Sequence, residues 1–177
     1  MKTNLLVFTG LFLAAVLSRL VPHGWNFTLM GAVFIFAGAY FKDRKISVAL
    51  MLSSLLVSDF FIGFHSMMPA VYAGFLAMIA VGAFLNVNAS RIRIFGGAFM
   101  ASLTFFIISN FGVCYEGQLY PMTFSGLIEC YVMGIPFFGK QMIGDVGFAL
   151  GLFELAKRLL ATESEAAPAP IEVKAED

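Results

Sequence analysis

The stretch that most constrains the fold runs from Ile46 to Phe64, reads ISVALMLSSLLVSDFFIGF, and carries Asp59 inside its apolar sequence. It is long enough to cross a bilayer as a helix. A carboxylate in hydrocarbon is costly and is rarely kept without a partner or a water-filled cavity beside it. The basic cluster Lys42–Lys45 precedes the stretch and marks its cytoplasmic end, because cytoplasmic loops are enriched in Lys and Arg. At about 1.5 Å per residue, Asp59 lies roughly 21 Å beyond Lys45, in the outer part of the membrane.

The composition agrees with a membrane protein. Hydrophobic residues make up 60% of the 177 and charged residues only 12%, whereas soluble domains hold roughly 45–50% apolar and 25% charged residues. The basic residues do not gather on a soluble face, so we expect no nucleic-acid partner. No nucleophile elbow, HExxH motif or GxxxxGK[ST] loop occurs in the sequence, and we therefore expect neither enzymatic activity nor nucleotide hydrolysis.

We expect an all-α, integral membrane bundle of six transmembrane helices within residues 1–160. The predicted spans are Leu5–Val21, Phe27–Phe41, Ile46–Phe64, Ala70–Val87, Ile94–Val113 and Met142–Leu160. The second is short for a span, which implies a buried or shielded helix end. Six spans place every basic cluster and both termini in the cytoplasm, except the lone Lys140. Residues 161–177 are predicted to be a disordered acidic cytoplasmic tail.

The segment Phe124–Phe138 is harder to assign, because Glu129 and Pro136 interrupt its apolar sequence. If it crossed the membrane there would be seven spans, and the basic pair at 157–158 would lie outside. We therefore interpret it as a partly buried external or re-entrant segment before the last helix.

Polar residues inside or next to the predicted spans share one depth. Arg19, Asn110 and Asp145 fall toward the outer side, as Asp59 does, and the external connections add four more residues: Asn26, His65, Tyr115 and Glu129. These side chains are predicted to converge on a ligand-binding cavity that opens outward. A second interpretation is a set of ion pairs that lock the bundle, with Arg19 pairing either Asp59 or Asp145. The two are compatible, since a pair that shapes a cavity can also bind a ligand.

Three further features concern packing. Gly10, Ala14 and Ser18 recur every four residues, which forms a stripe where another helix can approach closely; chance among abundant small residues explains the stripe equally well. Cys114 and Cys130 match no zinc or redox spacing, and we favour small packing residues over a disulfide, which stays open. No metal site or cofactor is predicted.

An ordered set of segments resembles one family. The segments are SRLVPHGWNFTLMGAVFIFAGAYF, LLVSDFFIGFH, FFIISNFGV and YPMTFSGLIECYVMGIPFF. Together they resemble an uncharacterised bacterial membrane family that is itself similar to the substrate-binding S components of energy-coupling-factor transporters. The resemblance covers Ser18 to about Phe153. Leu29 departs from the family's usual Pro, and Tyr115 follows Cys114 where a Trp is often found.

The resemblance implies a six-helix fold that binds a vitamin-like or metal-related ligand from outside. Its pocket would use the connections Val21–Asn26, His65–Pro69 and Gly112–Thr123. The first helix would dock on a transmembrane coupling subunit that works with separate ATPases, and Gly10, Ala14 and Ser18 occupy a plausible docking face. We expect a multi-pass protein of the bacterial plasma membrane, surrounded by lipid, that binds a small molecule for uptake. The alternative is a structural or assembly protein without a ligand, which binds another membrane protein through helix one.

Overall fold

The computed structural model describes residues 2–21 and 27–165, which form six helices and no strand. The all-α class predicted from the sequence is confirmed over this part of the chain. The helices are α1 (Lys2–Leu20), α2 (Met30–Tyr40), α3 (Arg44–Ile62), α4 (Met68–Gly82), α5 (Arg91–Glu116) and α6 (Phe124–Glu165).

The short helix α2 is the centre of the bundle. Nine of its 11 residues are buried, from Met30 to Gly38, and a helix that is apolar all round needs neighbours on every side. Two glycines allow α4 to approach it closely. A methyl group on Gly38 would collide with the Ile79 carbonyl, and one on Gly82 would collide with the Ile35 carbonyl. The helix α2 is therefore buried over most of its length, whereas from its shortness we had expected a buried or shielded helix end.

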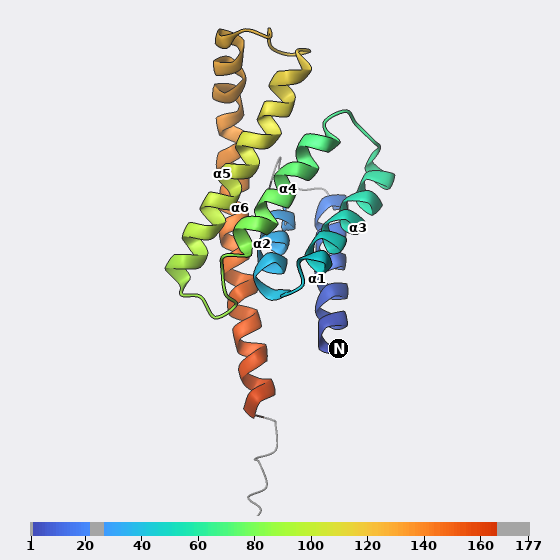
Figure 1. Ribbon diagram of the computed structural model, residues 1–177, viewed down its shortest axis with the longest axis vertical. Coiled ribbons are helices and arrows are strands. Elements are labelled where there is room, and N and C mark those ends of the chain that lie inside the picture. The colour runs from blue at the N-terminus through green and yellow to red at the C-terminus, as the bar shows by residue number, and fades with distance from the viewer. Residues whose placement is uncertain (1, 22–26, 166–177) are drawn as a thin grey trace, which may run out of the picture.

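The other helices surround α2 in two groups. On one side α1 packs mainly against α3, and on the other α4, α5 and α6 pack successively against one another. The start of α1, the end of α6 and the α2–α3 and α4–α5 connections all face one end of the molecule (Figure 1). This basic end holds Lys42–Lys45, Arg91, Arg93, Lys157 and Arg158. The α3–α4 and α5–α6 connections lie at the opposite, distal end.

The longest helix joins two segments that we had predicted to be separate. We expected an external or re-entrant segment at Phe124–Phe138 and a separate span at Met142–Leu160, but both belong to α6, a continuous helix of 42 residues with Pro136 inside it. The separate segment is therefore wrong. Packing against α5 keeps the chain helical, since Tyr131 donates a hydrogen bond of 2.7 Å to the Ile107 carbonyl and the rings of Phe106 and Phe138 lie 4.9 Å apart.

The length of α6 has two consequences. A helix of this length extends about 63 Å, and its distal part projects with α5 beyond the other helices (Figure 1). Its last turn also includes residues 161–165, which we had assigned to the tail. The rest of the predicted tail lies outside the described residues.

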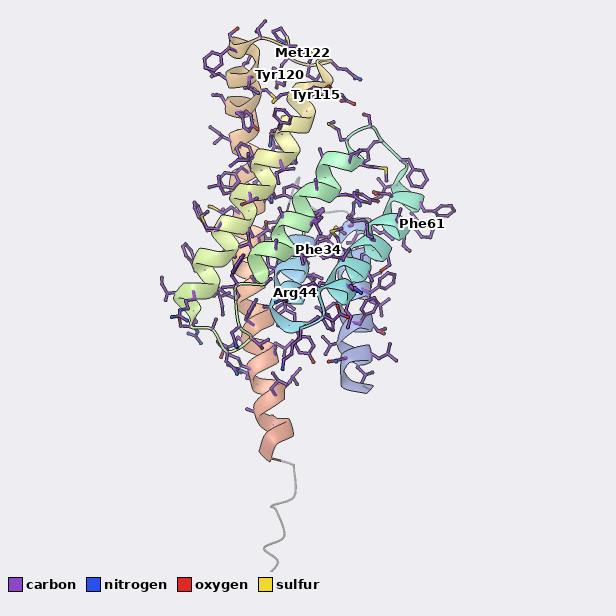
Figure 2. All side chains as sticks on the ribbon, in the orientation of Figure 1. Phe34, Arg44, Phe61, Tyr115, Tyr120 and Met122 are labelled. Carbon is purple, nitrogen blue, oxygen red and sulfur yellow. A yellow bond between two sulfur atoms is a disulfide. The ribbon has the colours of Figure 1, made fainter. Side chains whose placement is uncertain are left out.

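Two helices, α3 and α5, are long and apolar enough to cross a membrane. Only 39% and 28% of the residues in their apolar windows are buried, so much of their apolar surface faces outward. Three apolar helical stretches are shorter than these two: Asn4–Leu20 within α1, Met30–Tyr40 (α2) and Met68–Gly82 (α4). Figure 2 shows Phe61, near the end of α3, directed away from the bundle, whereas Phe34 of α2 lies within it.

Candidate functional site

Asp59 is fully buried on α3 and forms an ion pair with Arg19 of α1. Its Oδ1 lies 2.5 Å from Nη2 of Arg19, and its Oδ2 accepts a hydrogen bond of 2.6 Å from the Tyr72 hydroxyl of α4. Nη1 of Arg19 also donates to the Ser58 hydroxyl at 2.9 Å. The carboxylate thus joins three helices. Of the two partners predicted for Arg19, the structure selects Asp59.

Asp145 is equally buried, on α6, but its partners are neutral. Its Oδ2 accepts hydrogen bonds from the Ser102 hydroxyl of α5 at 2.7 Å and from Nε2 of Gln141 at 3.2 Å. Within the described part of the chain it forms no ion pair. Oδ1 lies against Gly31 of α2, where a methyl group would overlap it. The Asp145 carboxylate therefore contacts α2 and α5, and none of these contacts is with a cationic side chain.

A cavity of about 670 Å³ lies beside Asp145, between α2, α4, α5 and α6. Its walls come from the ends of α1 and α3, the starts of α2 and α4, the second half of α5, the α5–α6 connection and the first half of α6. The cavity therefore occupies the distal half of the bundle. The polar lining residues are Arg19, Thr28, Ser109, Asn110, Tyr120, Gln141 and Asp145. The apolar lining residues include Phe75, Phe105, Met133 and Phe137. Small-molecule sites combine this size with apolar walls and a few convergent polar groups.

Asn110 enters the cavity wall from α5. Its Nδ2 donates to the Phe106 carbonyl at 3.0 Å, one turn earlier, and its Oδ1 lies next to Gly134 of α6. A methyl group on Gly134 would come within 2.5 Å of that oxygen. The glycine therefore provides the space that the amide occupies.

The distal part of the cavity wall is cross-linked. Cys114 of α5 and Cys130 of α6 form a disulfide with their Cα atoms 5.9 Å apart, and both are buried. We had favoured two unlinked packing residues, and this interpretation is wrong. Spacing along the chain could not reveal the bond, because it depends on the contact between α5 and α6.

The predicted site residues divide into three groups. Arg19, Asn110 and Asp145 line the cavity, and Asp59 stands behind Arg19. Three others do not line it and are exposed: His65 in the α3–α4 connection, Glu129 on α6, and Tyr115, which is 69% exposed beside Phe111 at the distal end of α5 (Figure 2). Asn26 lies outside the described residues.

The predicted docking stripe on α1 is only partly open. Gly10 is exposed, with open space where a side chain would begin. Ala14 is half-buried against the core, and the half-buried Ser18 donates a hydrogen bond of 2.9 Å to the Ala15 carbonyl. Gly10 is therefore the member of the stripe that another helix could approach without rearrangement.

Sequence reasoning missed the neutral partners of the two carboxylates. Gln141 had a usable signal, because it precedes Asp145 by four residues and so lies on the same face of a helix. Tyr72 and Ser102 had none, since each reaches its carboxylate from another helix.

Comparison with known proteins gives a family but no function. No curated protein and no solved structure matches the chain. One family model matches residues 1–167, which include all six helices, and its description is a family of unknown function (DUF6580). The match covers far more than half of the 177 residues. The protein belongs to this family of unknown function.

Proposed function

We propose that the protein is a membrane-embedded subunit that binds a small molecule for uptake. The observation that carries this proposal is the cavity of about 670 Å³, because its polar side chains from α1, α5 and α6 meet among apolar walls. A protein that needed polar residues only for internal packing would satisfy them against one another and leave little space between them. The likeness to S components of energy-coupling-factor transporters, inferred from the sequence, points to the same function.

The proposed setting is the bacterial plasma membrane, with six spans and both termini in the cytoplasm. The basic residues support this orientation, since they gather at the end of the molecule that also holds the start of α1 and the end of α6 (Figure 1). The disulfide supports it independently, because disulfides persist in oxidising compartments and this one lies toward the distal end. Many large apolar side chains are exposed, including Leu6, Phe60 and Phe84, as expected where lipid covers them.

Uptake would require an energy source outside this chain. The sequence contains no phosphate-binding loop, so a coupling subunit and separate ATPases would drive release of a vitamin-like ligand to the cytoplasm. In this scheme α1 is the docking helix, and the open face at Gly10 is where the coupling subunit would approach.

A structural or assembly role is the second candidate, and the Asp59 cluster favours it. Arg19 pairs with Asp59 and donates to Ser58, and Tyr72 donates to Asp59, so these four residues link three helices without any ligand. The cavity distinguishes the two candidates, because an assembly protein gains nothing from an open space of this size.

The test fills the cavity without removing a contact that holds the bundle together. Ser109 lines the cavity, whereas Gly147 of α6 is exposed with open space around it. Wild type, Ser109→Phe and the control Gly147→Phe would be purified from membranes in equal amounts, and their bound small molecules identified by mass spectrometry. We expect a compound that copurifies with wild type and the control but not with Ser109→Phe. Equal retention by all three, or no bound compound in any, would support the structural role instead.

The orientation has its own test. A reporter active only in the cytoplasm, fused after Asp177, should be active, and a reporter active only outside should be silent at the same point. The reverse pattern would contradict the six-span arrangement.

A further inference from the structure

We infer that the cavity binds an organic cation, a protonated or quaternary amine, with the carboxylate of Asp145 as its charge partner. This inference rests on the proposed binding function and names the class of ligand. It begins with the charges at the cavity wall. Two of the lining residues are of charged types, Arg19 and Asp145. They are not equally available to pair with a charged ligand.

Arg19 is already neutralised. Its guanidinium lies 2.5 Å from the Asp59 carboxylate and donates a hydrogen bond to Ser58. An anionic ligand would therefore have to compete with a buried carboxylate for this cation. The pair as a whole contributes no net charge to the cavity.

Asp145 has no counter-charge among the described residues. Its hydrogen-bond donors, the Ser102 hydroxyl and the Gln141 amide, both bind Oδ2. They stabilise the carboxylate but do not neutralise it. A charged group among apolar helices is expensive unless it is paired, and a cationic ligand would supply the missing pair.

The shape of the cavity wall leaves the Asp145 carboxylate within reach of a bound ligand. Gly31 and Asp145 both line the cavity, and Oδ1 occupies the space that a side chain on Gly31 would fill. Because the two hydrogen bonds engage Oδ2, Oδ1 is the atom that remains to meet a ligand's cationic group.

The remaining walls also suit an organic cation. Phe75, Phe105 and Phe137 line the cavity, and aromatic faces attract cations. A bare divalent metal ion fits less well, since such ions take several oxygen or nitrogen ligands. Within the described residues no group of three or more His, Cys, Asp or Glu side chains comes together. The volume is also that of an organic molecule.

The experiment compares three probes that share a benzyl group and differ in charge. Benzyltrimethylammonium is cationic, benzyl methyl sulfone is neutral and phenylmethanesulfonate is anionic. Each is titrated by ligand-observed NMR against the full-length protein in nanodiscs, with protein-free nanodiscs as the blank. We expect the cation to bind at least about tenfold more tightly than the sulfone, because a charge-assisted contact is worth this factor. The sulfonate should bind most weakly.

Variants assign the preference to Asp145. Asp145→Asn keeps the shape and removes the charge, so the cation and the sulfone should bind within about twofold of each other. Glu129→Gln removes a carboxylate from an exposed position outside the cavity and should keep the wild-type preference. If Asp145→Asn does not fold, the ranking of the three probes on wild type decides, and absence of a cation preference overturns the inference.

The cavity-filled variant separates the two proposals. If the sulfone or the sulfonate binds wild type as tightly as the cation, and Ser109→Phe abolishes that binding, the cavity is a binding site and only the inferred ligand class is wrong. If none of the probes distinguishes wild type from Ser109→Phe, the binding function fails as well.

Discussion

Asp59 and Asp145 are the same residue type, both essentially inaccessible to solvent, and both sit in apolar helices of one bundle. Their surroundings differ in charge. Asp59 meets an arginine and a tyrosine hydroxyl and is not among the residues that line the cavity, whereas Asp145 meets two neutral donors and lines this space of about 670 Å³. Burial alone therefore does not separate a structural carboxylate from a candidate binding carboxylate.

The difference lies in what completes each site. The Asp59 cluster finds its counter-charge within the chain, because Arg19 of α1 pairs with the carboxylate and Tyr72 of α4 donates a hydrogen bond to it. The Asp145 site has hydrogen bonds but lacks a counter-charge among the described residues. A buried carboxylate whose counter-charge comes from the same chain is suited to stabilising the fold. A buried carboxylate without one is suited to binding a charged ligand.

Breaking the Asp59 cluster should produce the largest effect. Arg19→Gln leaves a buried carboxylate without its cation, which typically costs about 3–5 kcal/mol. We expect this loss in the free energy of unfolding, measured by denaturant titration in detergent. The double variant Arg19→Gln with Asp59→Asn removes both charges and should recover most of the loss. A single variant as stable as wild type would show that the pair does not hold α1 against α3.

Crowding Asp145 should produce the next largest effect. Gly31→Ala places a methyl group where Oδ1 of Asp145 and the terminal carbon of Met78 now lie. Overpacking of this kind costs about 1–3 kcal/mol, and we expect a lower midpoint of thermal unfolding. The control is Gly10→Ala, where nothing lies within 4 Å, and which should be neutral or stabilising because Ala favours helix. If Gly31→Ala and Gly10→Ala changed the midpoint of thermal unfolding equally, the Asp145 carboxylate would be able to move away from the added methyl group at no cost in stability.

Much of the fold was predictable because it depends on local patterns. Apolar stretches located α1 to α5, with Lys and Arg marking the cytoplasmic ends that we expected. The shortness of the stretch around Phe34 indicated a buried or shielded helix end, and the helix is buried over most of its length. The region after Glu116 was not predictable in this way. Pro136 and Glu129 resemble an interruption when the sequence is considered alone, but α5 provides a surface along which α6 continues.

The site was predictable only in part, for a related reason. A charged residue in an apolar helix is conspicuous by itself, so Arg19, Asp59 and Asp145 could be named in advance. Which of them meet depends on how helices pack. The same limit explains Tyr115 and His65, which were assigned to the site as residues of the expected external connections but lie exposed outside the cavity.

The smallest effect on stability, with a measurable effect on binding, is expected at Asn110. Its amide nitrogen bonds to the carbonyl one turn earlier on the same helix, so Asn110→Ala loses a local contact and gains helix propensity, and stability should stay within about 1 kcal/mol of wild type. Thr104→Ala is a matched control, because its hydroxyl makes the same kind of bond to the Met100 carbonyl at an exposed position. If the cavity binds ligands through Asn110, affinity for benzyl methyl sulfone, whose oxygens can accept a hydrogen bond from the amide, should fall several-fold in Asn110→Ala and not in Thr104→Ala. Equal affinities in NMR titrations would leave Asn110 as a wall residue without a role in binding, and would confine polar recognition to the Asp145 side of the cavity.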